Sequence, residues 1–315
     1  MSNAKRARAT LLATGGTIAH GPGGIRLGAR DLVAGVEGNL ARDGIEVEVE
    51  DLKRVPSSSL TPEDVLGMLR RAESALPDSR GVVITHGTDT LEETGFLFSL
   101  HWERDAPLVL TGAMRPARTP GEDGPRNLSA ACRVATDPRS RGRGPLVVMH
   151  DKIFRAGDVT KIHSWDTDTF SADSGPEGSI DPWNYLTYHR PPGRPQILSR
   201  KPKEYPEPVA IVTVGTGSDG SEVDALVSAG YRGLVVAVAG RGGIPEGTGD
   251  ALVRAISAGT VVVATSRCPL GGTASGYDSR GILWAGGLNA PKARLLLMTG
   301  LALWGRDGDR LAEIF

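Results

Sequence analysis

Short runs of apolar, often β-branched residues alternate with helical patterns along most of this chain. The runs predict strands at 9–14, 45–52, 81–86, 107–111, 145–149, 209–214, 233–239 and 260–265. Several are continuously apolar, which is typical of parallel strands that are buried on both faces. Helical patterns between them are expected to begin near Thr61, Thr88, Arg126, Ser221, Glu246 and Asn289. The alternation predicts an α/β fold with largely parallel sheets flanked by helices.

The clearest helix start is the sequence Thr61-Pro62-Glu63-Asp64. A threonine in this position can cap the first turn, and proline is well tolerated at the first helical residue. The acidic residues that follow favour the positive end of the helix dipole. We therefore expect a helix that begins directly after Thr61.

A proline-rich segment divides the chain into two parts. Residues 190–208 contain six prolines and show no clear hydrophobic period, which favours a linker. The prediction is a larger N-terminal α/β domain at 1–190, a linker at 191–208 and a smaller C-terminal α/β domain at 209–315. Both lengths are ordinary for domains, and 39% hydrophobic residues suffice for packed cores.

Composition and net charge limit the classes of binding partner that we expect. The net charge is −1 and the basic residues are scattered, so nothing indicates binding to nucleic acid or to an anionic membrane. The six histidines include no HxxxH or HExxH pair, so no metal site is expected. Two isolated cysteines fit a reducing compartment. No apolar run suits a signal peptide or a bilayer crossing, and we expect a cytoplasmic protein.

Three threonine- or glycine-rich turns follow predicted strands, at 14–17, 85–90 and 111–113. In open α/β sheets, binding sites form in the loops beyond the carboxyl ends of the strands. If the three strands are neighbours, the turns converge at one edge of the sheet. This edge is the expected position of a functional site.

Each motif also has an ordinary structural interpretation when it is taken alone. The Thr14–Thr17 turn can be a plain strand-to-helix connection, although its glycines also allow a ligand to approach the backbone closely. Thr88 and Asp89 can cap a helix and complement its dipole, or they can hold an amine. Lys161 can be a solvated charge, or a base for a nearby hydroxyl if it is desolvated.

The motifs in combination resemble the bacterial L-asparaginase family. The matching segments are ATGGTIA at 13–19, VITHGTDTLEET at 83–94, GAMRP at 112–116, DGPRNL at 123–128 and GDVTK at 157–161. LNAPKARLLL at 288–297 is similar to the family's C-terminal helix. The resemblance covers nearly the whole chain. It implies a homotetrameric enzyme, or at least a homo-oligomer, that hydrolyses L-asparagine to L-aspartate and ammonia without a cofactor.

The resemblance also assigns roles to individual residues. Thr17 corresponds to the nucleophile that forms an acyl intermediate, and Thr88, Asp89 and Lys161 correspond to a second hydroxyl–acid–base group. An unactivated threonine hydroxyl is a poor nucleophile, so a base within hydrogen-bond reach is required. These four residues are the expected catalytic set.

A second group is expected to bind the substrate. By resemblance, Ser57 binds the α-carboxylate, Asp89 binds the α-ammonium, and the Ala113 carbonyl accepts a hydrogen bond from the amide nitrogen that leaves. Gly16 and Gly87 belong to the two turns whose backbone N–H groups, with Thr88, would stabilise the oxyanion.

The sequence departs from the family pattern at three places. The family's lid supplies a tyrosine near the nucleophile, but residues 20–31 contain none. Our candidate substitutes for this tyrosine are Tyr277, from the C-terminal loop of an adjacent subunit, and Lys161 acting through Thr88. Gly243 stands where the family has an asparagine, and the shortened loop 271–281 lacks the family's glutamate. These changes concern substrate affinity and the choice between asparagine and glutamine.

Other functions remain open at this point. A glutaminase-asparaginase of broader specificity would carry the same motifs, and a catalytically weakened homologue could bind an amino acid without turnover. The sequence 215–220 also matches the GxGxxG pattern of dinucleotide sites. That pattern lacks the acidic residue expected about 20 residues further on, and Arg241 would at most suit a 2′-phosphate.

Overall fold

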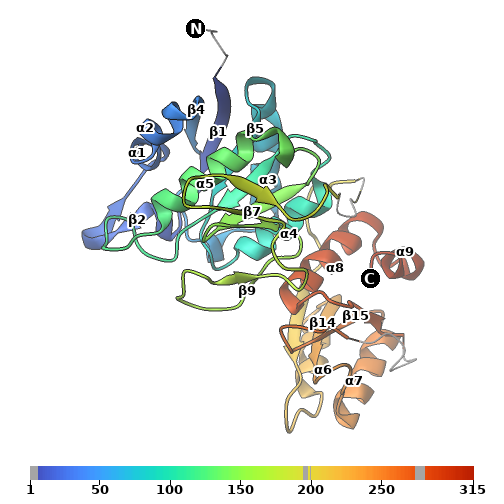
Figure 1. Ribbon diagram of the computed structural model, residues 1–315. Helices are drawn as coiled ribbons and strands as arrows, with labels where there is room; N and C mark the ends of the chain where they lie inside the picture. The colour runs from blue at the N-terminus through green and yellow to red at the C-terminus, as the bar shows by residue number, and fades with distance from the viewer. Residues whose placement is uncertain (1–5, 194–197, 199, 274–280) are drawn as a thin grey trace. The chain divides into compact units, whose positions relative to one another are not determined.

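The computed structural model describes residues 6–193, 198, 200–273 and 281–315. The chain forms two compact units, residues 1–199 and 200–315 (Figure 1). Each unit contains its own sheet, and we describe the two separately.

The first unit is built on an eight-stranded sheet within the described residues, in the order β12-β11-β8-β7-β6-β5-β1-β4. One side of the sheet is parallel: β4 (Ile45–Asp51), β1 (Ala7–Ala13), β5 (Gly81–Thr85), β6 (Leu108–Thr111) and β7 (Pro145–Met149). The other side is antiparallel: β8 (Lys152–Arg155), β11 (Gly178–Ile180) and β12 (Leu186–Tyr188). The parallel strands agree with the sequence prediction to within one or two residues, whereas the antiparallel edge was not predicted.

Five α-helices accompany this sheet in the described residues: α1 (Ala29–Ala34), α2 (Glu37–Arg42), α3 (Pro62–Ala75), α4 (Leu91–His101) and α5 (Gly124–Thr136). The predicted cap of α3 is confirmed, because the Thr61 hydroxyl accepts a hydrogen bond from the Asp64 N–H. Helix α4 begins three residues after Thr88, so the interpretation of Thr88 as its cap is wrong.

One hydrophobic core lies between the sheet and helices α1, α2 and α5. Alternate residues of the parallel strands, such as Leu11, Val83 and Val109, pack there against Leu40 and Leu128. Strands β5 and β7 are buried along their whole length, as expected for continuously apolar strands covered on both faces. This core holds the ends of neighbouring strands in a fixed register.

Short elements complete the first unit. Two hairpins are formed by β2 (His20–Gly21) with β3 (Ile25–Arg26), and by β9 (Thr160–Lys161) with β10 (Phe170–Ser171). The 3₁₀ helices are Thr17–Ala19, Pro22–Gly24, Ser57–Ser59, Leu76–Asp78 and Pro138–Ser140. Elements of two or three residues show no hydrophobic period, so the sequence did not reveal them.

The second unit contains a four-stranded parallel sheet in its described part. The strands follow chain order: β13 (Val209–Thr213), β14 (Gly233–Val238), β15 (Val261–Ser266) and β16 (Leu283–Trp284). The accompanying helices are α6 (Ser221–Ser228), α7 (Glu246–Ser257), α8 (Ala290–Trp304) and α9 (Gly308–Ala312). The α/β prediction holds for this unit too. None of the described helices has both the length and the apolar character that a bilayer crossing requires.

Candidate active site

The register of three neighbouring strands brings the threonine-rich turns together. In β1, β5 and β6, Ala13 pairs with Thr85, and Thr85 pairs with Thr111. The strands therefore end at the same level, and the turns that follow them leave from one edge of the sheet. The convergence expected from the sequence is confirmed.

Two glycines allow the first two turns to touch. Gly16 has φ of 84°, and a Cβ placed on it would lie 2.5 Å from the Cα and the backbone nitrogen of Gly87. A Cβ on Gly87 would in turn lie 2.7 Å from Ser57 Oγ. Side chains at either position would force the segments apart, so the close approach of the two turns depends on glycine.

Hydrogen bonds hold the segment that carries Ser57 against the second turn, residues 85–90. The Thr90 hydroxyl donates a hydrogen bond to the Ser57 carbonyl at 2.9 Å, and the Thr90 N–H donates to Ser57 Oγ at 3.4 Å. Ser57 is itself buried. The serine hydroxyl is therefore held next to the Gly87–Asp89 turn rather than at the surface.

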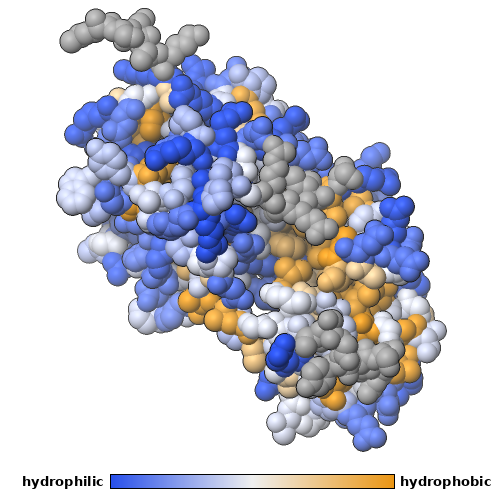
Figure 2. Space-filling view, turned by 45° about the vertical axis from the view of Figure 1, so that its right-hand side comes forward, coloured by the Kyte–Doolittle hydropathy of each residue, from blue (hydrophilic) through white to orange (hydrophobic). Residues whose placement is uncertain are grey.

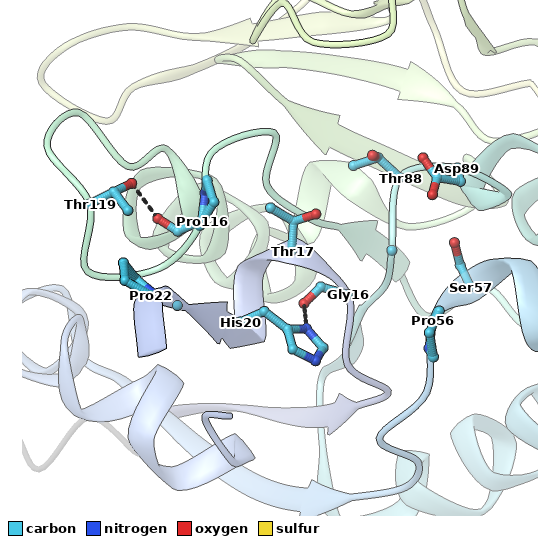
Figure 3. Close-up of a pocket in the computed structure, with 12 residues that line it drawn as sticks. Gly16, Thr17, His20, Pro22, Pro56, Ser57, Thr88, Asp89, Pro116 and Thr119 are labelled. Carbon is cyan, nitrogen blue, oxygen red and sulfur yellow. Dashed lines mark hydrogen bonds between the residues drawn. The ribbon is translucent and has the colours of Figure 1, made fainter. Parts of the chain in front are cut away.

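A cavity of about 440 Å³ opens between these segments (Figure 3). Its lining contains six of the residues named from the sequence: Gly16, Thr17, Ser57, Gly87, Thr88 and Asp89. Figure 3 shows the Thr17 hydroxyl directed toward the side of the cavity formed by Thr88, Asp89 and Ser57. Both threonines thus face one small cavity.

Lys161 reaches the second threonine from a distant part of the chain. Its Nζ donates hydrogen bonds to Thr88 Oγ1 and to Asp89 Oδ1, each at 3.0 Å. The Lys161 side chain is only 14% exposed, whereas that of Asp89 is 73% exposed. The backbone N–H of Lys161 donates to Glu92 Oε2 at 2.8 Å. The predicted hydroxyl–acid–amine group is therefore present as one connected network.

A buried, neutral histidine, His86, is hydrogen-bonded to the turn that carries Gly87 and Thr88. His86 is fully buried, and burial lowers the pKa of its imidazole to about 4. Nδ1 lies 2.7 Å from the Gly87 carbonyl and must donate to it, so Nε2 accepts from the Thr94 hydroxyl at 3.0 Å. His86 also contacts the third turn through its backbone, because the His86 backbone N–H donates to the Thr111 carbonyl at 2.8 Å.

The third turn is clamped by the motif at 123–128. The Asp123 carboxylate accepts hydrogen bonds from the N–H groups of Met114, at 3.1 Å, and Arg115, at 2.9 Å. The Asn127 amide donates to the Gly112 carbonyl at 3.1 Å. Ala113, predicted to contact the substrate, lies inside this clamp with no exposed surface and is not among the residues that line the cavity.

His20 was missed by the sequence analysis. It lies three residues after Thr17, at the end of the 3₁₀ helix Thr17–Ala19, and it lines the same cavity. Its Nδ1 lies 2.6 Å from the Gly16 carbonyl, which fixes a donating N–H at that nitrogen. His20 follows this helix in extended backbone, with φ of −114° and ψ of 136°, and no spacing in the sequence marked it as a site residue.

The remaining predicted site residues lie in the second unit. Tyr277 falls outside the described residues. Gly243 forms a short antiparallel bridge with Ala239. In the GxGxxG segment, the Asp219 carboxylate accepts a hydrogen bond from the Ser221 N–H at 2.9 Å, and this bond lowers the pKa of Asp219. A carboxylate thus already occupies the start of α6, where a dinucleotide would place its diphosphate. No cluster suited to a metal ion occurs among the described residues.

Comparison with known proteins agrees with this geometry. Residues 8–192 match the family described as "Asparaginase, N-terminal", and residues 208–315 match the "Glutaminase/Asparaginase C-terminal domain". The two matches together span both units of the fold, which is therefore that of an amide-hydrolysing enzyme. The chain belongs to the asparaginase family.

Individual relatives span nearly the whole chain. "L-asparaginase 2" of Escherichia coli is 35% identical over 97% of this chain and 92% of its own length. "Probable L-asparaginase periplasmic" of Haemophilus influenzae is 35% identical over 93% of this chain and 88% of its own. The crystal structure of a "Probable Cytoplasmic L-asparaginase" from Campylobacter jejuni superposes with a TM-score of 0.87, at 32% identity, over 98% and 99% of the two chains.

Proposed function

We propose that this protein is an L-asparaginase, which hydrolyses L-asparagine to L-aspartate and ammonia through an acyl intermediate on threonine. The observation that carries the proposal is the shared cavity. Two threonine hydroxyls line it, and one of them is hydrogen-bonded to a largely buried lysine. The L-asparaginases among the relatives support the choice of substrate.

In the proposed mechanism Thr17 attacks the side-chain carbonyl carbon of asparagine. The backbone N–H groups of the two glycine-bearing turns stabilise the oxyanion. The proton of the Thr17 hydroxyl passes to the amide nitrogen and the carbon–nitrogen bond breaks. Ammonia leaves, and a β-aspartyl ester remains on Thr17. Water, deprotonated through Thr88 and Lys161, hydrolyses the ester and restores the free hydroxyl.

Substrate recognition is assigned to groups around the same cavity. Asp89 is exposed toward the cavity and suits the α-ammonium group, while Ser57 suits the α-carboxylate. The Ala113 carbonyl is the proposed acceptor for the amide nitrogen that leaves. Because Ala113 has no exposed surface and does not line the cavity, this contact requires the turn at 111–113 to move when the substrate binds.

A broader glutaminase-asparaginase is the second candidate, because the family description of the C-terminal domain names both activities. A protein that only binds amino acids is less well supported. The Lys161 amine is hydrogen-bonded to the Thr88 hydroxyl. Binding of an amino acid without turnover does not require an amine at this hydroxyl.

The test is ammonia release from L-asparagine, L-glutamine and D-asparagine. L-asparagine should give the highest kcat/KM. Thr17→Ala should abolish release, while Thr187→Ala, on an exposed position of β12 outside the cavity, should leave it intact. No release from any of the three amides would refute the proposal, and retained release in Thr17→Ala would reassign the nucleophile.

We further propose a homo-oligomer, a dimer or tetramer, that resides in the cytoplasm. Large apolar side chains are exposed beside the site, with Ile162 55% and Trp165 74% exposed, and Leu270 is 60% exposed in the second unit. Figure 2 shows hydrophobic residues gathered on part of the smaller unit. Exposed apolar surface of this kind favours association. Light scattering after size exclusion tests the oligomer, and cell fractionation tests the compartment.

A further inference from the structure

One side chain of the cavity is hydrogen-bonded to the backbone beside the proposed nucleophile. His20 Nδ1 lies 2.6 Å from the Gly16 carbonyl oxygen, and Figure 3 draws this contact as a dashed line. The carbonyl can only accept, so the imidazole donates the hydrogen bond. The peptide unit that presents the Gly16 carbonyl also carries the N–H of Thr17. The His20 side chain therefore holds the peptide unit that leads into Thr17.

The backbone by itself leaves this peptide unit free to turn. Gly16 has φ of 84° and ψ of −178°, and a residue without Cβ rotates about these angles more freely than any other. A planar trans peptide points its C=O and its N–H in opposite directions. A donor that holds the Gly16 carbonyl therefore also sets the direction of the Thr17 N–H. It polarises the peptide unit as well, which makes the N–H a stronger donor.

The Thr17 N–H is available to a ligand. Within the described residues it donates to no protein group, and the same holds for the Thr88 N–H. Backbone N–H groups in the interior are almost always paired, and both threonines line the cavity. The oxyanion of the proposed reaction would supply the acceptor that both groups lack. The direction of these two N–H groups therefore affects the rate of that reaction.

The second threonine has the same arrangement. The imidazole of His86 donates to the Gly87 carbonyl at 2.7 Å, and this carbonyl shares its peptide unit with the Thr88 N–H. An imidazole thus holds the glycine carbonyl that precedes each of the two threonines. His86 is buried behind its turn, whereas His20 reaches its carbonyl from the β2–β3 hairpin.

Backbone contacts hold the hairpin that carries His20. His20 and Gly21 form β2, which pairs with β3, and the His20 carbonyl accepts a hydrogen bond from the Ala117 N–H at 2.8 Å. A Cβ on Gly21 would lie only 2.7 Å from the Ala117 carbonyl oxygen. None of these contacts involves the imidazole. The hairpin should therefore keep its place when the His20 side chain is changed.

We propose that His20 is a positioning residue for amide hydrolysis: its imidazole holds the peptide unit between Gly16 and Thr17 so that the Thr17 N–H is directed at the oxyanion. This inference rests on the proposed function. The imidazole acts through the peptide unit and not by contact with the substrate. Its effect falls on the transition states of ester formation and ester hydrolysis, because the carbonyl oxygen gains negative charge in both.

The test compares two side chains of the same shape at position 20. Leucine and asparagine both branch at Cγ, but only asparagine offers an N–H close to the position of the imidazole Nδ1. His20→Leu should lower kcat for ammonia release from L-asparagine by roughly 10–100-fold, because misplacement of a catalytic group by about 1 Å costs about 100-fold. KM should change little, since the lost interaction belongs to the transition state. His20→Asn should recover most of kcat.

Arg26→Leu is the matched control, because Arg26 is exposed on β3, pairs with His20 in the hairpin and does not line the cavity. It should keep the wild-type kcat and KM. Thermal unfolding should show that all three variants are folded, and His20→Ala takes the place of His20→Leu if the leucine variant is unfolded.

The outcomes separate this inference from the proposed function. Wild-type kcat in His20→Leu, or equal losses of kcat in His20→Leu and His20→Asn, would overturn the positioning role and leave the proposed function intact. A rise in KM at constant kcat would make His20 a binding residue, and an equal fall in kcat in Arg26→Leu would assign the effect to the hairpin; either result would also overturn the positioning role. Absence of ammonia release from the wild-type protein would refute the proposed function itself and this inference with it.

Discussion

The contact between Gly16 and Gly87 can be tested with a single methyl group. In Gly16→Ala, the new Cβ would lie 2.5 Å from two backbone atoms of Gly87 and 3.0 Å from the carbonyl carbon of His86. Backbone cannot swing aside as a flexible side chain can. Because ordinary contact begins at 3.4 Å, the two turns must separate by about 0.9 Å, or the variant must store the strain.

The expected loss of stability has two sources. Gly16 has φ of 84° and ψ of −178°, a region that is nearly restricted to glycine and costs other residues about 1–3 kcal/mol. Overpacking adds about 1–3 kcal/mol, so the free energy of unfolding should fall by about 2–6 kcal/mol. A misplacement of roughly 1 Å between catalytic groups costs about 100-fold in rate, and kcat for ammonia release should fall by that order.

Gly23→Ala separates the two causes. Gly23 also has positive φ, 69°, but a Cβ there would meet no atom within 4 Å. It should lose about 1 kcal/mol, from backbone strain alone, and should keep its kcat. Urea unfolding and ammonia release measure both quantities. If Gly16→Ala were no less stable than Gly23→Ala and equally active, the argument that this contact positions the two threonines would be wrong.

Three further perturbations test other parts of the site. Lys161→Met should lower kcat by about 100-fold or more while KM changes little, because the amine acts in the transition state; a rise in KM at constant kcat would make it a binding residue. Burial holds the pKa of His86 in the folded protein at about 4, against 6.5 for the free side chain. Protons therefore bind preferentially to the unfolded state, and the free energy of unfolding falls as the pH drops from 6.5 toward 4. Between pH 7 and pH 5 this loss should be about 2 kcal/mol by urea unfolding, and an unchanged pH slope in His86→Gln would exclude the residue as its source. Asp123→Ala removes the acceptor for two backbone N–H groups and should cost about 1–2 kcal/mol; unaltered thermal stability and kcat would show that the clamp is dispensable.

The sequence by itself determined the architecture of the parallel strands and most helix starts. A strand that is buried on both faces requires a continuous apolar run, so β7 and β14 could be predicted from their own residues. A helix cap requires particular side chains at particular positions, so the Thr61 cap could be predicted in the same way. The motif match also located Thr17, Thr88 and Asp89, since each lies in a turn directly after a strand.

Tertiary structure alone decided how these residues meet. The Gly16–Gly87 contact, the bond from Lys161 to Thr88 across 73 residues, and the place of His20 in the cavity each join segments that are distant or show no periodicity. The antiparallel edge formed by β8, β11 and β12 escaped prediction for the same reason, because strands of three or four residues carry too short a pattern. Local sequence encodes which face of a helix or strand is buried. Strand order and register determine which turns become neighbours, and here they bring together the turns that form the site.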